Sequence, residues 1–320
     1  MANQKVFKTL DEQIEILKNK NLIINDIDGA KEILLRENYF FLMGYRHLFL
    51  KHDSSRTFKV GTTFDELYSL FVFDRMFRNI IFKNLLIVEN NYKSIFSYTL
   101  SRKYGYKEKE YLDVKNFDND KSRLRQINDL IRKVKRQYRV NGTQHGATSH
   151  YIENYGYIPL WIGIKVISFG LISEMFSVLK ATDKKDIADV YKVEPDEMEV
   201  YLPILANYRN LCAHEDVLFD HFTQRIVPDN KYHKMLDIDK TNGEYVYGKN
   251  DIFALIIILK RLLTDVDFKM MMNEINYELD KLQGKLNTIS IEDVLEKMGF
   301  PLNYKDIMYM WGVIIWEEKV

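Results

Sequence analysis

One short stretch of the sequence combines residue types that can do chemistry together. Residues 208–216 read YRNLCAHED and contain Arg209, Asn210 and His214. An arginine guanidinium can hold a phosphate through two parallel hydrogen bonds, and an imidazole can exchange a proton near neutral pH. RNA cleavage without a metal needs little more, because the 2′-hydroxyl of the RNA is itself the nucleophile and the product carries a 2′,3′-cyclic phosphate.

Helix geometry constrains how these side chains can cooperate. Asn210 and His214 are four residues apart and share one helix face, whereas Arg209 points about 140° away from His214. We therefore expect Asn210 to orient the imidazole. Arg209 must lean in from the side, reach across a helix end or serve a second subunit. A two-fold homodimer would bring an arginine and a histidine from each chain to one seam.

Two other interpretations of this stretch are open. An arginine and a histidine near a helix C-terminus often only complement the helix dipole and cap its last carbonyls. A metal-dependent nuclease using His214, Asp216 and His221 is a further alternative, although residues 219–228 look irregular rather than helical. No ligand set with the spacing of a metal site is evident elsewhere, so we expect neither a metal nor a cofactor.

The elements that must position the stretch are helices. Five prolines and fourteen glycines in 320 residues favour long helices. Residues 64–104 lack both and carry apolar residues at helical spacing, which predicts one long helix or two abutting helices. Further helices are predicted over residues 159–179 and 195–213, each opened by a proline. The predicted fold is all-α, with one small β-hairpin as an option between residues 228 and 250.

Charged residues interrupt the apolar pattern of the 64–104 segment. Asp74 and Arg78 are four residues apart, and so are Glu89 and Lys93, which is the spacing of ordinary ion pairs on a helix surface. A buried polar network close to residues 208–216 is the alternative interpretation.

The segment 121–139 is the most basic part of the chain. It contains eight lysines and arginines but one acid, Asp129, and a stripe of apolar residues predicts a helix with a cationic outer face. The stripe consists of Leu124, Ile127, Ile131 and Val134, and Tyr138 is expected to add a stacking surface.

The formal net charge of the whole chain is zero, so binding to a polyanion requires a local patch of this kind. A merely solvated face is the alternative. We expect contacts to the RNA backbone from Arg125, Arg132, Lys133, Lys135, Arg136 and Arg139.

Composition also bounds the environment of the protein. The one cysteine, Cys212, rules out an internal disulfide and fits a reducing cytosol, and its apolar neighbours predict a buried thiol rather than a nucleophile. Residues 1–20 lack the apolar core of a secretory signal. The longest apolar run, residues 252–259, is far shorter than the roughly twenty residues of a membrane span. We expect a soluble cytoplasmic protein without membrane contact.

The string RNLCAHE resembles the R-x4-H signature of the HEPN superfamily of helical ribonucleases. With five other strings in order, it resembles the Abi family of bacterial abortive-infection proteins, of the AbiD/AbiF kind, over nearly the whole chain. Some relatives carry a second basic residue or histidine after the signature, where this chain has Glu215, Asp216 and Val217. The other strings are NYFFLMGY at 38–45, FDRMFR at 73–78, PLW at 159–161, SFG at 168–170 and MGFP at 298–301.

The resemblance implies a HEPN-like helical core at residues 64–265, between an N-terminal extension at 1–63 and a C-terminal helical extension at 266–320. It implies an endoribonuclease of an abortive-infection or toxin–antitoxin system that acts against phage. RNA would be the substrate, and a small antitoxin RNA or protein would restrain the enzyme. The alternative is a non-catalytic helical module that binds RNA or a protein partner.

Overall fold

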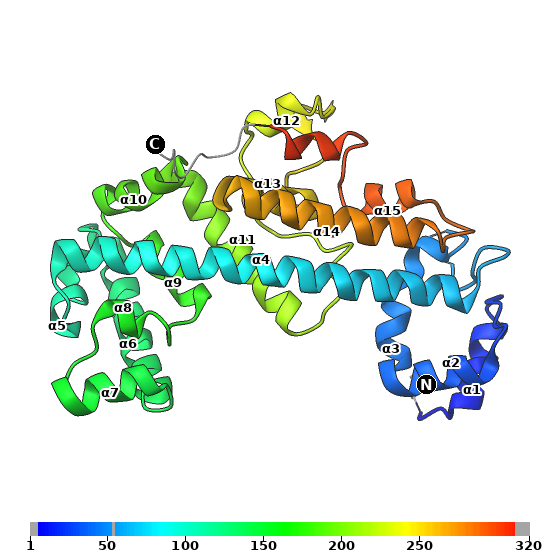
Figure 1. Cartoon of the computed structure of the whole chain (residues 1–320), viewed down its shortest axis with the longest axis horizontal. Helices are drawn as coiled ribbons and strands as arrows, with labels where there is room; N and C mark the ends of the chain where they lie inside the picture. The colour runs from blue at the N-terminus through cyan, green and yellow to red at the C-terminus, as the bar shows by residue number, and fades with distance from the viewer. Residues whose placement is uncertain (1–5, 53–54, 311–320) are drawn as a thin grey trace.

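The computed structural model describes residues 6–52 and 55–310, and one long helix runs through its centre (Figure 1). This helix, α4 (Phe64–Tyr104), is 41 residues long. The helices α11 (Pro195–Ala213), α13 (Ile252–Leu262) and α14 (Asp265–Gln283) all pack against it. The prediction of an all-α fold with one small hairpin is confirmed, and residues 64–104 form one helix rather than two.

The two ends of α4 are set by local sequence. The hydroxyl of Thr63 accepts a hydrogen bond from the N–H of Glu66 and caps the first turn. The carboxylate of Glu66 is buried and accepts bonds from the backbone of Asn287 and Thr288, which ties the C-terminal part of the chain to this end. At the other end Gly105 has φ +91°, a conformation that favours glycine and stops the helix.

The N-terminal helices gather at the Thr63 end of α4 (Figure 1). The first of them begins with a capping box, in which Thr9 and Glu12 bond each other's backbone N–H groups. They are α1 (Leu10–Lys18), α2 (Ile27–Glu37), α3 (Tyr39–Leu42) and the 3-10 helix η1 (Met43–Phe49).

A group of short helices follows α4 and lies at its Gly105 end (Figure 1). From there α9 (Phe169–Ser177) packs against both α6 and α11 and so connects this group to the centre. The chain then continues through α10 (Ala181–Ala188) and η4 (Asp189–Tyr191). The group itself consists of α5 (Glu108–Tyr111), η2 (Val114–Asn116), η3 (Lys121–Arg123), α6 (Leu124–Asn141), α7 (Gly146–Tyr155) and α8 (Leu160–Gly163).

The prediction of one helix over residues 159–179 is wrong, because α8 and α9 are separate. Ser168 adopts an extended conformation, and its hydroxyl accepts the N–H of Leu171 to cap a new helix. A serine competes with the helix backbone for hydrogen bonds, so it starts α9 rather than continuing α8.

The C-terminal part contains the predicted hairpin and the most buried helix. Strands β1 (Lys240–Thr241) and β2 (Glu244–Tyr245) pair through Asn242 and Gly243, whose φ values of +54° and +87° suit a type I′ turn. Every residue of α13 is buried. No helix in the described ranges is long and apolar enough to cross a membrane. The remaining elements are α12 (Lys231–Met235), α15 (Ile291–Lys297) and η5 (Tyr304–Met308).

Candidate active site at the end of α11

The helix that carries the RNLCAH string ends within it. The N–H of Asp216 bonds the carbonyl of Leu211 at 3.2 Å, and the N–H of Glu215 bonds that of Cys212 at 3.4 Å. These two bonds form a Schellman motif, with Glu215 in the left-handed region at φ +58°. His214 is the C-cap residue of α11, immediately before Glu215, and its side chain is exposed.

Arg209 lies against α4 rather than beside His214. Its Nε is 3.4 Å from a carboxylate oxygen of Glu89, and its guanidinium lies 5.7 Å from the ring centroid of Phe82. The Glu89 side chain is 8% exposed and also pairs with Lys93 at 2.7 Å. The Arg209 side chain is nevertheless 35% exposed. Glu89 and Phe82 of α4 therefore hold the Arg209 side chain in place, while about a third of it remains accessible to solvent.

A second buried pair on α4 holds the segment that follows the helix. The carboxylate of Asp74 pairs with Arg78 and accepts the N–H groups of Leu218 and Phe219 at 3.0 and 2.8 Å. Burial raises the pKa of Asp74, and Arg78 and the backbone N–H groups oppose that rise. The Tyr45 hydroxyl donates to the same carboxylate at 2.7 Å.

The alternative of a buried polar network close to residues 208–216 is thus confirmed. Glu89, which pairs with Lys93, contacts α11 at Arg209, and Arg78 donates to the carbonyl of Asp216 at 3.3 Å. The two pairs hold α11 and the segment after it at two separate points of one helix.

The exposed face of α11 is polar. Asn207, Asn210 and His214 lie on it and are exposed. Within the described part of the chain, no hydrogen bond joins the side chains of Asn210 and His214. Instead Asn207 bonds the Nε2 of His221 at 3.1 Å.

His221 lies in a cavity beside this face. Its ring packs edge-on against Tyr208, and burial lowers its pKa. The cavity has a volume of about 430 Å³ and is also lined by Pro203, Asn207 and Arg225. Among residues 6–52 and 55–310, no three His, Cys, Asp or Glu side chains are grouped to hold a metal ion, and His214, Asp216 and His221 are not brought together.

Cys212 is a buried structural thiol, as predicted. It is 7% exposed, and burial raises its pKa to about 12. A thiol with so high a pKa carries almost no thiolate near neutral pH and is a poor nucleophile.

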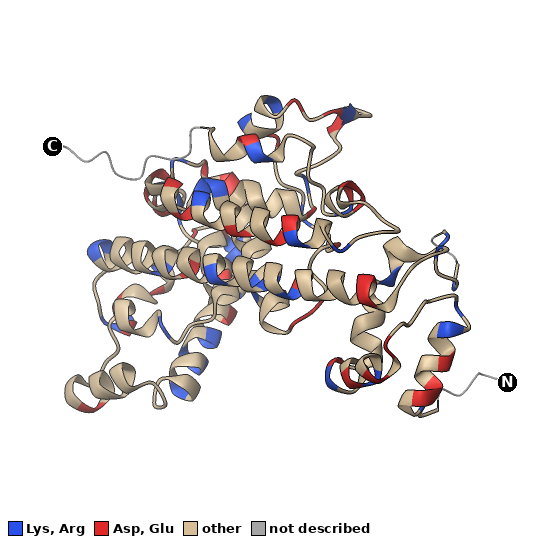
Figure 2. Cartoon of the chain, turned by 45° about the vertical axis from the view of Figure 1, so that its right-hand side comes forward, with Lys and Arg blue, Asp and Glu red and all other residues tan. Residues whose placement is uncertain are grey.

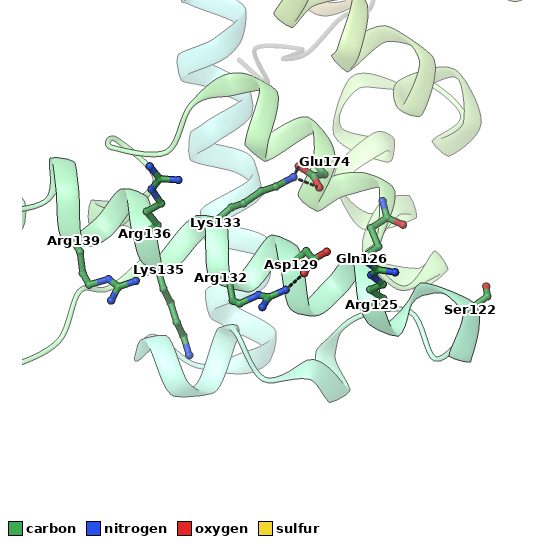
Figure 3. Close-up of a pocket in the computed structure, with 10 residues that line it drawn as sticks. All are labelled: Ser122, Arg125, Gln126, Asp129, Arg132, Lys133, Lys135, Arg136, Arg139 and Glu174. Carbon is green, nitrogen blue, oxygen red and sulfur yellow. Dashed lines mark hydrogen bonds and ion pairs between the residues drawn. The ribbon is translucent and has the colours of Figure 1, made fainter.

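The predicted cationic helix exists as α6, where Figure 2 shows lysine and arginine positions along the ribbon, and Arg125, Arg132, Lys133, Lys135, Arg136 and Arg139 are all exposed. They line an open depression of about 780 Å³ (Figure 3). Arg132 pairs with Asp129, and Lys133 pairs with Glu174 on α9. No ion pair within the described residues involves Arg125, Lys135, Arg136 or Arg139.

Two details of the predicted basic helix are wrong. Tyr138 is 5% exposed, so its ring is not available for stacking with RNA. Its hydroxyl accepts a hydrogen bond from that of Tyr111 at 3.1 Å, and its ring packs on Gly163. Leu124 is 47% exposed, since the helix begins at this residue and η3 precedes it. Leu130 and Tyr138 complete the inner stripe instead.

Some contacts of the site were not anticipated from sequence. Asn207 precedes Asn210 by three and His214 by seven residues, so helical spacing alone could have placed it on their face. The pairing of Asn207 with His221 spans an irregular segment, and that of Arg209 with Glu89 joins residues 120 positions apart. No local signal indicates such contacts.

Comparison with known proteins identifies the family of the chain. A family model described as Abi-like protein matches residues 32–220, which run from α2 to the segment held by Asp74. The match spans α4, α6 and α11 and covers more than half of the 320 residues. No curated protein and no solved structure matches the chain. The protein belongs to the family of Abi-like proteins.

Proposed function

We propose that this protein is a metal-independent endoribonuclease of abortive-infection defence against phage. Family membership points to abortive infection. The observation that carries the ribonuclease proposal is the end of α11, where Arg209 and His214 both reach solvent although α4 anchors the backbone around them. RNA cleavage requires a preorganised phosphate clamp and a proton-transfer group, and the end of α11 exposes one residue of each kind.

In the proposed reaction each side chain has one role. The 2′-oxygen attacks the adjacent phosphorus, the bond to the 5′-oxygen breaks, and a 2′,3′-cyclic phosphate and a 5′-hydroxyl form. Arg209 holds the scissile phosphate and offsets the charge that develops on it. His214 takes the proton of the 2′-hydroxyl or delivers one to the leaving oxygen. Asn210 orients the phosphate or the imidazole.

A homodimer would complete this site. One imidazole cannot be base and acid in the same step, so two copies of His214 would serve the two proton transfers. The exposed face with Asn207, Asn210 and His214 is polar and lies at the surface, where a two-fold axis can pair it with itself. The α6 face, with its unpaired cations, would hold the RNA backbone or a restraining antitoxin RNA.

One observation favours a second candidate function. Glu89 already pairs with Arg209, and Phe82 packs on it, which is what a purely structural arginine would show. On this view the protein is a non-catalytic helical module that binds RNA or a protein partner.

Induced expression separates the two candidates. Wild-type protein and a His214→Ala variant are expressed at matched levels, growth is followed, and total RNA is run on a gel. The ribonuclease proposal expects arrested growth and new RNA fragments with the wild type only. Arrest by both proteins with intact RNA would favour the binding module.

A further inference from the structure

An aromatic surface that the proposed site does not use lies on the group of short helices. Its rings form a chain from Tyr151 through Tyr155, Tyr157 and Tyr106 to Trp161, which we call the aromatic ladder. Successive ring centroids are 5.2, 6.3, 5.6 and 6.3 Å apart. Tyr155, Trp161 and Tyr106 are 57%, 45% and 43% exposed. Tyr151 and Tyr157 are half-buried between them, so three exposed rings are joined into one aromatic patch, which indicates a binding surface.

The rings of the ladder are tilted against one another rather than stacked in parallel. Adjacent planes are inclined by 35° to 54°, so no ring covers the face of the next as a parallel stack would. The ammonium of Lys107 lies 5.7 Å from the ring centroid of Tyr106 and 5.4 Å from that of Tyr157. Lys109 and Lys165 are exposed and follow Tyr106 and Trp161 by three and four residues in the sequence. Open aromatic faces beside lysines suit flat bases joined by phosphates.

The backbone beneath the ladder is fixed. Ile158, next to Tyr157, is held at both of its backbone groups: its N–H donates to Glu108 at 2.9 Å, and its carbonyl accepts from the Tyr111 hydroxyl at 2.9 Å. A rigid platform loses little entropy when a ligand binds.

The ladder and the cationic helix α6 belong to one structural unit. The Tyr111 hydroxyl also contacts Tyr138 of α6, and the Tyr138 ring fills the space where Gly163 of α8 lacks a side chain. Tyr138 on the buried face of α6 therefore packs on the elements next to the ladder, while the cations of α6 line the open depression on its other side (Figure 3).

We infer that the aromatic ladder binds single-stranded RNA by stacking on its unpaired bases. This inference deepens the proposed function by naming the substrate class, and it rests on RNA being the ligand. Duplex RNA buries its base faces and offers α6 only phosphates. A protein partner fits the ladder less well, because lysine is depleted from the core of protein interfaces and Lys107 lies over two of these rings.

Binding measured in a His214→Ala background tests the inference without cleavage. A labelled 12-nucleotide RNA without self-complementarity and the matching duplex are titrated by fluorescence anisotropy. The ladder variant is Tyr155→Leu with Trp161→Leu, which keeps apolar side chains but removes the rings. The control is Tyr98→Leu with Tyr277→Leu, two tyrosines that are 66% and 63% exposed elsewhere. Thermal melts verify that all variants are folded.

We expect the ladder variant to bind the single strand about tenfold or more weakly, with control and duplex binding changed less than about twofold. Single-strand binding within about twofold of the parent would overturn the inference. Loss of self-association in sedimentation, with RNA binding kept, would also overturn it and assign the ladder to a second copy.

Tryptophan fluorescence provides a second readout that needs no ladder variant. The chain has three tryptophans, so Trp311→Phe with Trp316→Phe leaves Trp161 as the reporter. Stacking predicts saturable quenching of Trp161 by the single strand, and unchanged emission at saturating RNA would contradict it. RNA cleavage by the wild type tests the proposed function separately. RNA binding that depends on the ladder, without cleavage, would contradict only the nuclease proposal. Cleavage combined with binding that does not depend on the ladder would contradict only the inference about the ladder.

Discussion

The carboxylate of Glu89 lies 3.4 Å from the Nε of Arg209 and 2.7 Å from the Nζ of Lys93, so one buried acid of α4 holds two cations. We predict that Glu89→Gln lowers the free energy of unfolding by about 3–5 kcal/mol, because it leaves Lys93 charged and buried without a partner. Urea denaturation measures the loss. Glu274→Gln is the control, since the Glu274–Lys83 pair is exposed and should contribute less than about 0.5 kcal/mol.

Removing both members of the buried pair separates folding from positioning. Glu89→Gln with Lys93→Met deletes the pair together and should recover most of the stability. Arg209 still loses its anchor in this double variant. We therefore expect RNA cleavage to fall about tenfold to a hundredfold in a folded protein. Full cleavage by the double variant would show that Glu89 has no positioning role.

Asp74 joins α4 to the backbone after α11, and Asp74→Asn should break that link. Asparagine keeps one acceptor oxygen, so its amide nitrogen loses either the bond from Phe219 or the bonds from Leu218, Tyr45 and Arg78, and the ion pair with Arg78 is lost in both cases. We predict a loss of about 3–5 kcal/mol in the free energy of unfolding. Asp65→Asn, an exposed acid on the same helix, serves as the control and should cost far less. Equal effects of the two changes would refute a special role for Asp74.

Glu215 occupies a left-handed position that glycine would fill without strain. Glu215→Gly should raise the free energy of unfolding by about 0.5–1 kcal/mol. This net gain is the backbone strain that glycine relieves, reduced by the greater conformational entropy of glycine in the unfolded chain. Ala213→Gly, two residues earlier in the last helical turn, should lower it by about the same amount. Thermal melts of the two variants should therefore shift in opposite directions, and a shift in the same direction would contradict the Schellman geometry.

The unpaired cations of α6 should dominate its contacts to phosphate. We predict that changing Lys135, Arg136 and Arg139 to Glu weakens RNA binding. For single-stranded RNA, the slope of log affinity against log salt concentration should become smaller in magnitude by about 2. Arg132 and Lys133 should matter less, because Asp129 and Glu174 already pair with them. The control changes Lys234, Lys285 and Lys305 to Glu, which alters the net charge by the same amount at positions away from α6. An equal effect of that control would mean that net charge, not the α6 face, drives binding.

Helical periodicity and the rarity of proline and glycine were enough to predict α4, α11 and the all-α fold. Apolar spacing also indicated which face of α6 is buried, except at Leu124 and Tyr138. Sequence alone could not show that Glu89 contacts Arg209 or that Asp74 binds the backbone at Leu218. These contacts join residues that only packing brings together.

The break at Ser168 and the aromatic ladder illustrate the same limit. A serine between two apolar stretches fits an exposed helix position as well as a cap, and the local pattern does not distinguish them. Tyr106 is separated from Tyr155 and Trp161 by α5 and α6, so no local pattern joins their rings into one surface.

RNA cleavage by the purified protein tests most directly whether Arg209 and His214 form a ribonuclease site. Wild type and His214→Ala are incubated with one RNA in EDTA, and the 3′ ends of the products are analysed by periodate oxidation, which a 2′,3′-cyclic phosphate resists. We predict periodate-resistant fragments from the wild type and a rate at least about a hundredfold lower for His214→Ala, with unchanged RNA binding. Equal rates for the two proteins would contradict the role of His214, and fragments with free 3′-hydroxyl ends would contradict the proposed reaction.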